Sequence, residues 1–247
     1  MVSNILKKKW YISKFMKLTI IIPVFNEKKT ILKLLALVEK QKFIDKQIII
    51  VDDCSNDNSF ELINEFKFLS EYKILKHQKN YGKGECIKTA KKFINGDIVL
   101  IQDADLEYNP DDYQNLIQPI LNNEFKVVYG SRVLNKKRYR NHNFISLVRI
   151  MVNHILTILS NMINQQKLTD AHTCYKVCSR EVFDKIKLYE SDFAFCPEFT
   201  CKISKIKEKI KEVPIEYIGR THAEGKKIKS IDGIRAIYTL IKYGIFK

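Results

Sequence analysis

The sequence contains no run of apolar residues long enough to cross a membrane. A spanning helix needs roughly 18 or more consecutive apolar residues, and no stretch of the 247 residues reaches that length. Three lysines at 7–9 are followed by no apolar segment of signal-peptide length. We therefore expect a cytoplasmic protein whose six cysteines are reduced thiols.

Several common nucleotide and metal motifs are also missing. G-x-G-x-x-G does not occur, which argues against a dinucleotide-dependent dehydrogenase, and the absence of G-x-x-x-x-G-K-[ST] argues against a P-loop NTPase. The later cysteines are spaced C-x₃-C and C-x₄-C rather than as the C-x₂-C pairs of zinc sites. We predict that they are small buried side chains and not zinc ligands: Cys174, Cys178, Cys196 and Cys201.

The charge of the chain is strongly unbalanced towards the basic side. Its 43 Lys and Arg residues against 28 Asp and Glu give a net charge of +15. Such an excess indicates an anionic partner, which can be nucleic acid, an anionic lipid or a phosphate-bearing substrate. A hydrophobic content of 45% and a charged content of 29% are typical of a folded globular protein.

Apolar runs alternate with helical periodicity through the first part of the chain. Such βαβα order predicts an α/β fold, with a mostly parallel sheet covered by helices on both faces. The strand segments are almost continuously apolar, which is typical of strands buried on both sides. We expect strands at 18–22, 48–51, 72–75, 97–101 and 126–129, with helices around 30–38, 60–68 and 85–94 and after Pro110.

The second part of the chain has a different organisation. We divide the sequence into an extension (1–16), a nucleotide-binding half (17–135) and an acceptor-binding half (136–247) of a single domain. An amphipathic helix is expected at 144–163, either as a core helix or lying in a membrane interface. An edge strand is expected at 211–217, because Pro214 cannot donate to a ladder, and an apolar helical tail follows at 231–246.

Carboxylates follow three of the expected strands. Asp103 and Asp105 close the strand at 97–101, Asp53 follows the second strand, and Glu27 follows the first. Open α/β sheets bind ligands at the carboxyl edge of their strands. There the two carboxylates of Asp-x-Asp can hold Mg²⁺ or Mn²⁺ and, through it, a diphosphate. Alternatively, the aspartates form a solvated turn, and the nearby Asn and Ser residues are ordinary helix caps: Asn26, Ser55 and Asn109.

A glycine-containing turn precedes the helix expected at 85–94. In the segment Asn80–Gly84, Gly82 and Gly84 permit close backbone approach, and Lys83 can meet a phosphate. The alternative is an ordinary helix-entry turn.

Taken in order, these motifs resemble those of family 2 glycosyltransferases, and among them the dolichyl- or polyprenyl-phosphate mannosyl- and glucosyltransferases. The resemblance covers about residues 17 to 245. Each motif alone is weak, but five in the right order are highly specific. They are Ile20–Glu27, Val51–Asp57, Asn80–Gly84, Asp103–Leu106 and Gly130–Arg132, and the likeness continues through Thr169–Asp170, Thr173–Lys176 and Gly219–Lys227.

The resemblance implies a GT-A fold, a nucleotide-sugar donor, a divalent cation and inversion at the anomeric carbon. Donor-binding residues would be Pro23, Phe25, Glu27, Asp53, Lys83, Asp103 and Ala104. The cation, Mg²⁺ or Mn²⁺, would be held by Asp103, Asp105 and Glu107, where Glu107 stands in a position that often carries Gln. Asp105 and Arg132 would be catalytic, and Arg132, Arg220 and Lys226 would bind the acceptor phosphate, with Arg140 or Arg149 as a further contact.

The acceptor implied is a polyprenyl or dolichyl phosphate on the cytoplasmic face of a membrane, to which the enzyme would bind peripherally. A phosphate monoester is already largely anionic at neutral pH, so it needs cationic clamps more than a base. The alternative acceptor is a saccharide of a cell-envelope polysaccharide, for which Glu198 or Asp170 would be the base. The Gln-x-x-Arg-Trp motif of processive synthases is absent, since the only tryptophan is Trp10.

Two other classes of function fit the sequence less well. A nucleic-acid-binding module would need basic and aromatic residues interleaved on one face, whereas here carboxylates occupy the expected ligand edge and would repel a phosphate backbone. We therefore expect no nucleic-acid partner. A nucleotidyltransferase could use the same acidic edge, but it would release pyrophosphate rather than UDP or GDP.

Overall fold

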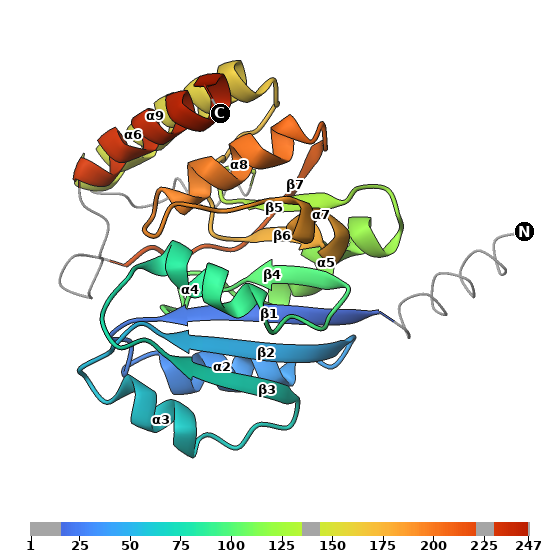
Figure 1. The fold of residues 1–247 in the computed structure, drawn as a ribbon, viewed down its shortest axis with the longest axis vertical. Helices are drawn as coiled ribbons and strands as arrows, with labels where there is room; N and C mark the ends of the chain where they lie inside the picture. Colours follow the sequence, from blue (N-terminus) through green and yellow to red (C-terminus); the bar gives the residue numbers. More distant parts are fainter. Residues whose placement is uncertain (1–15, 135–143, 221–229, 247) are drawn as a thin grey trace, which may run out of the picture.

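The protein is built around one seven-stranded mixed sheet, with helices on both faces (Figure 1). The computed structural model describes residues 16–134, 144–220 and 230–246, and only the backbone for 144–149 and 230. The strand order is β3-β2-β1-β4-β6-β5-β7. The strands are β1 (Lys17–Val24), β2 (Asp45–Asp52), β3 (Glu71–Lys76), β4 (Ile98–Ile101), β5 (Val127–Ser131), β6 (Lys176–Ser179) and β7 (Ile210–Pro214).

Helices connect these strands and then form a separate group near the carboxyl end. The α-helices are α2 (Ile31–Lys40), α3 (Ser59–Glu65), α4 (Lys83–Lys91), α5 (Tyr113–Leu121), α6 (Phe144–Asn164), α7 (Arg180–Lys185), α8 (Phe195–Lys205) and α9 (Ser230–Ile241). A 3₁₀ turn, η1 (Pro110–Asp112), leads into α5, and a π-helical turn, η3 (Lys242–Phe246), follows α9.

The first four strands are all parallel, as the sequence predicts. β1 pairs with β2 on one side and with β4 on the other, and β2 pairs with β3. The central residues of β1, β2 and β4 are buried because helices cover both faces, which explains the continuous apolar runs Ile20–Ile22 and Ile48–Val51. Pro23 lies inside β1, but the pairing of β1 with β4 ends at Ile21, so the missing N–H of Pro23 breaks no bond with β4.

Strand β6 was not expected from the sequence, and neither were the helices α7 and α8 that follow it. Strand β6 runs antiparallel between β4 and β5, so the sheet is mixed although most of its pairings are parallel. The run Lys176–Ser179 is only four residues long, and no periodicity separates so short a strand from its surroundings. The expected edge strand is present as β7, parallel to β5 at the end of the sheet, but it ends at Pro214 rather than at residue 217.

Helices α6 and α9 pack together and against α8 at one end of the molecule, away from α3 (Figure 1). A small second hydrophobic core lies between these helices. It is formed by Cys201 of α8, Leu240 of α9 and Tyr243 of η3, and Leu159 of α6 packs against this cluster. Helix α6 has nearly the bounds expected from the sequence. Within the described parts of the chain, no helix is both long and apolar enough to cross a bilayer.

Candidate active site

The order of the strands places a topological switch point, called here the crevice, at the carboxyl ends of β1 and β4. From β1 the chain moves outward to β2 and β3, and then it returns to β4 on the other side of β1. Connections therefore leave β1 and β4 in opposite directions, which is where open α/β sheets bind ligands. Three non-glycine residues with positive φ lie just beyond strands there, Asn26 (51°), Cys54 (63°) and Leu106 (60°).

Four acidic residues, Glu27, Asp103, Asp105 and Glu107, line this crevice and are called here the acidic cluster. Arg220, from the segment after β7, reaches into it. Its Nη1 lies 2.9 Å from Oε2 of Glu27, and its Nη2 lies 2.9 Å from Oδ2 of Asp105. The backbone N–H of Arg220 also donates to Oε1 of Glu107 over 2.7 Å. The sequence reading assigned Arg220 to the acceptor, but in this structure it contacts the carboxylates expected to serve the donor.

Asp105 is the member of the cluster with the most strongly perturbed ionisation. Burial, together with the charges of Asp103 and Glu107, raises its pKa to about 7, while the charge of Arg220 opposes the shift. The carboxylates of Asp103 and Glu107 thus lie close enough to Asp105 to oppose its ionisation. Carboxylate oxygens are the ligands that Mg²⁺ and Mn²⁺ prefer, so the chemistry of the cluster fits such a cation.

The carboxylates are nevertheless not gathered as a ready-made cation site. Among the described residues, no three acids of the cluster have oxygens within 4.8 Å of one another. Lys83 holds Asp103, with Nζ 2.5 Å from Oδ1, and Arg220 holds Asp105 and Glu27. A bound cation would therefore have to compete with these basic side chains for the same oxygens.

Lys83 is held in a buried position at the start of α4. Burial would lower its pKa, but the charge and hydrogen bond of Asp103, together with Cys174 and Cys196, outweigh that effect and hold the pKa well above its ordinary value. The same Nζ lies 3.1 Å from Sγ of Cys174. Lys83 thus remains charged beside the acidic cluster, as a phosphate-binding lysine must.

The glycines on either side of Lys83 are required by packing against a distant loop. Gly82 has φ of 97°, and a Cβ on it would lie 2.4 Å from the carbonyl oxygen of Ser191. A Cβ on Gly84 would lie equally close to the carbonyl oxygen of Glu190. The close backbone approach expected from the sequence is therefore to the loop before α8.

Asp53, beside the crevice, holds the turn before α4 and the end of β3 in place through hydrogen bonds. Its carboxylate accepts the backbone N–H groups of Tyr81 (2.9 Å) and Gly82 (2.7 Å), and its Oδ1 lies 2.7 Å from Nδ1 of His77. The sequence reading missed His77, although it directly follows β3. Glu27, Asp53 and Asp103 were predicted to lie at the ligand-binding edge because each follows a strand of the parallel sheet, and the same reasoning applies to His77.

Arg132 and Asp170 form a buried pair beyond the end of β5. Nε of Arg132 donates to Oδ2 of Asp170 over 2.6 Å, and Nη2 donates to Oδ1 over 2.8 Å. Burial alone would raise the pKa of Asp170, but the charge and hydrogen bonds of Arg132 hold it well below its usual range. Nδ2 of Asn153 on α6 donates to the same carboxylate. Asp170 is therefore ionised and holds Arg132 and Asn153 in place. A carboxylate with so low a pKa is a poor general base.

Glu198, the other base considered for a saccharide acceptor, also has a structural role. It is fully buried in the first turn of α8, where its carboxylate accepts the backbone N–H groups of Tyr189 and Glu190. It thus holds the loop against which Gly82 and Gly84 pack.

The remaining predicted site residues fall into two groups. Pro23 and Phe25 are half-buried at the end of β1, and Ala104 is buried between the two aspartates. Lys226, Arg140 and the side chain of Arg149 lie outside the described residues. The sequence reading missed Tyr217, whose hydroxyl donates to Oε2 of Glu107 over 2.7 Å. The two are 110 residues apart, so no local signal connected them.

The four cysteines that were predicted not to be zinc ligands are all buried: Cys174, Cys178, Cys196 and Cys201. Within the described residues, none of them belongs to a group of potential metal ligands. Their expected role as small buried side chains is consistent with this structure.

Comparison with known proteins identifies a family and several relatives. Residues 19–187 match the profile of glycosyl transferase family 2. The chain is 29% identical over 240 residues to a UDP-N-acetylglucosamine–dolichyl-phosphate N-acetylglucosaminyltransferase of Methanococcus voltae, covering 90% of this chain and 94% of that one. It is 28% identical over 246 residues to a dolichyl-phosphate beta-glucosyltransferase of Trichomonas vaginalis, covering 93% and 73%.

A solved structure supports the fold. Glucosyl-3-phosphoglycerate synthase of Mycobacterium tuberculosis, crystallised with Mn²⁺, UDP and phosphoglyceric acid, superimposes with a TM-score of 0.73. The match covers 98% of this chain and 83% of that one at 16% identity. The expected GT-A-like fold is confirmed by this likeness, which at such identity concerns the fold alone.

Proposed function

The chain belongs to glycosyltransferase family 2, and on that premise we propose that it transfers a hexose from a nucleotide sugar to a polyprenyl or dolichyl phosphate. The donor would be of the GDP-mannose or UDP-glucose type, and the anomeric configuration would be inverted. One observation carries the proposal: the acidic cluster meets Lys83 and Arg220 in the crevice at the ends of β1 and β4. Relatives named for transfer to dolichyl phosphate support the choice of acceptor.

On the donor side, the nucleotide would lie along Pro23, Phe25 and Asp53, and the diphosphate beside Asp103 and Asp105. A divalent cation, Mg²⁺ or Mn²⁺, would supply positive charge that stabilises the departing nucleoside diphosphate. Lys83 and Arg220 already hold positive charge at this point of the crevice. If the carboxylates held the cation, both basic side chains would be able to pair with phosphate oxygens.

On the acceptor side, a phosphate needs orientation rather than deprotonation, because its second pKa of about 6 leaves it largely ionised at neutral pH. Arg132 has five N–H donors, of which one on Nε and one on Nη2 meet Asp170, and those of Nη1 would bind the acceptor phosphate. Asp170 and Glu198 both hold structural partners. These contacts favour a phosphate acceptor over a saccharide, which would require a base.

We propose further that α6 and α9 rest on the anionic surface of a membrane, on its cytoplasmic face. Each presents an exposed apolar stripe at helical spacing, and the two helices pack side by side (Figure 1). The net charge of +15 complements anionic headgroups. The exposed residues are Met151, Val152, Ile155, Ile158 and Met162 on α6, and Ile231, Ile234, Ile237, Tyr238 and Ile241 on α9.

The transfer reaction is tested by incubating the protein with Mn²⁺, a polyprenyl phosphate and a panel of nucleotide sugars, and by measuring release of UDP or GDP. Asp105→Ala and EDTA should each abolish release. Asp45→Ala is the matched control, because Asp45 is exposed at the amino end of β2, on the opposite edge of the sheet. Full activity of Asp105→Ala would refute the role of the acidic cluster, and release that requires a saccharide instead of the lipid phosphate would refute the acceptor.

Membrane binding is tested by flotation with anionic liposomes. The double variant Ile155→Asp/Ile234→Asp should lose lipid binding, because both residues are exposed in the apolar stripes. Leu69→Asp is the matched control, since Leu69 is 82% exposed but lies between α3 and β3. If the control variant loses binding as strongly as the double variant, or if wild type does not float, the proposed surface is wrong.

A further inference from the structure

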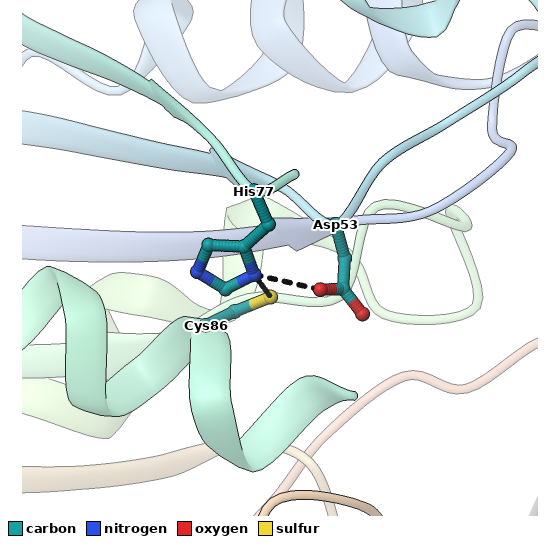
Figure 2. A group of neighbouring side chains, drawn as sticks. All are labelled: Asp53, His77 and Cys86. Atoms are coloured by element: carbon teal, nitrogen blue, oxygen red, sulfur yellow. Dashed lines mark hydrogen bonds and ion pairs between the residues drawn. The ribbon is translucent and has the colours of Figure 1, made fainter. Parts of the chain in front are cut away.

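Three side chains of different chemistry converge beyond the carboxyl ends of β2 and β3 (Figure 2). Asp53 directly follows β2, His77 directly follows β3, and Cys86 lies in α4. Their potential ligand atoms all lie within 4.8 Å of one another. Nδ1 of His77 faces both partners, at 2.7 Å from Oδ1 of Asp53 and 4.0 Å from Sγ of Cys86.

We propose that Asp53, His77 and Cys86 form a binding site for a thiophilic divalent cation of the zinc class, distinct from the acidic cluster. Carboxylate oxygen, imidazole nitrogen and thiolate sulfur are the three ligand types that Zn²⁺ accepts. Mg²⁺ takes oxygen ligands almost exclusively, so this set discriminates against it. A solvent molecule would complete a four-coordinate shell.

The second nitrogen of His77 supports this assignment. Nε2 lies 3.0 Å from Oγ1 of Thr89, which is also on α4. Metal-binding histidines usually donate their other ring N–H to an oxygen, which fixes the orientation of the ring. If Nε2 donates to Thr89, the lone pair of Nδ1 points at the shared space between Asp53 and Cys86.

The charge of the site also favours a divalent cation. The carboxylate of Asp53 is 3% exposed and the thiol of Cys86 is fully buried, so an uncompensated charge there is costly. Burial raises the pKa of Cys86 well above its ordinary value, and the charges of Asp53 and Asp52 raise it further. A divalent cation bound by one carboxylate and one thiolate makes the site neutral, and the thiol proton passes to solvent.

The ligands are already held near the geometry that such an ion requires. The N–H groups of Tyr81 and Gly82 fix the carboxylate of Asp53, and these two bonds can remain when the cation replaces the hydrogen bond to His77. Zinc bonds of about 2.0–2.3 Å require the three ligand atoms to move only slightly. The bound ion would tie the ends of β2 and β3 to α4.

The test uses Co²⁺ as a spectroscopic substitute for Zn²⁺ in the full chain. We expect a thiolate-to-Co²⁺ charge-transfer band together with the intense visible bands of four-coordinate Co²⁺. One equivalent of Zn²⁺ should remove both, whereas excess Mg²⁺ should not. Cys86→Ala should abolish the charge-transfer band, and Thr89→Val should weaken Zn²⁺ affinity roughly 10- to 100-fold.

Two variants serve as controls. Cys178→Ala removes another buried cysteine, in β6, and should leave the cobalt spectrum unchanged. Asp105→Asn should also leave it unchanged, which separates this site from the acidic cluster. Circular dichroism verifies that each variant is folded. If wild type shows only the weak spectrum of octahedral Co²⁺, or if Cys86→Ala retains the charge-transfer band, the three residues form a hydrogen-bonded cluster and the proposal is wrong.

Discussion

Nη2 of Arg220 lies 2.9 Å from Oδ2 of Asp105, so a residue of the segment after β7 neutralises a carboxylate that follows β4. The same guanidinium also pairs with Glu27, which follows β1. One basic side chain thus bridges the carboxylates that follow β1 and β4 and occupies oxygens that a metal cation would need. This competition leads to the first prediction.

Arg220→Ala should bind Mn²⁺ more tightly than wild type, although its transfer activity should fall. The variant removes the competitor for Asp105 and Glu27. An ion pair worth about 1 kcal/mol corresponds to roughly a fivefold gain in affinity. Thermal shift measured against Mn²⁺ concentration gives the affinity, with Arg180→Ala as the control, because Arg180 pairs with Asp184 near the surface. Weaker Mn²⁺ binding by Arg220→Ala would show that Arg220 helps the cation instead.

The response to Mn²⁺ should depend on pH through Asp105. Because the pKa of Asp105 is raised to about 7, the carboxyl is largely protonated below that pH and must lose its proton to bind a cation. Stabilisation by Mn²⁺ should therefore grow as the pH rises from 5.5 to 8.5. A pH-independent response in wild type would contradict the assignment of Asp105 as a cation ligand.

Without a cation, the stability of the protein should change with pH in the opposite direction. Between the ordinary pKa of 3.8 and about 7, the folded state binds more protons at Asp105 than the unfolded state. The free energy of unfolding should therefore fall as the pH rises through this window. Asp105→Asn should remove this component, which is measured as the difference between the stability curves of variant and wild type over pH.

Asp170→Ala should be strongly destabilising, because it leaves the buried guanidinium of Arg132 without a counter-charge. Breaking a buried pair in this way costs about 3–5 kcal/mol, measured by urea unfolding. Asp170 is fully buried and also accepts from Asn153, so α6 should loosen as well. Glu181→Ala is the control, because its pairs with Lys126 and Lys185 are exposed and should leave the unfolding midpoint nearly unchanged. Equal effects of the two variants would contradict this account.

Gly82→Ala and Gly233→Ala should have opposite effects on stability. Gly82 has φ of 97° and meets Ser191, so an added Cβ should destabilise by about 1–3 kcal/mol and displace Lys83. Gly233 lies within α9, and a Cβ there meets nothing within 4 Å. Ala should therefore stabilise that helix by about 0.5–1 kcal/mol. The unfolding midpoints of the two variants, compared with that of wild type, test both expectations. If Gly82→Ala were as stable as wild type, the loop before α8 would have to move away from the added Cβ.

Much of the donor side could be predicted from local sequence alone. Strands buried on both faces require continuous apolar runs, so Ile20–Ile22, Ile48–Val51 and Ile98–Ile101 were recognisable. Residues after parallel strands meet at one edge, so Glu27, Asp53 and Asp103 could be brought together without coordinates. His77 obeys the same rule and could have been found by it.

Only the tertiary structure decided how these groups are paired. Arg220 with Asp105, Arg132 with Asp170, and Tyr217 with Glu107 join residues 115, 38 and 110 positions apart. Such contacts depend on β6 entering the sheet antiparallel and on β7 closing its edge, and no periodicity encodes either. The chain by itself therefore determined which strands are buried and which carboxylates meet at their ends. Packing between distant segments places the charges around Asp105. Those charges determine whether Asp105 is protonated, pairs with Arg220 or binds a cation.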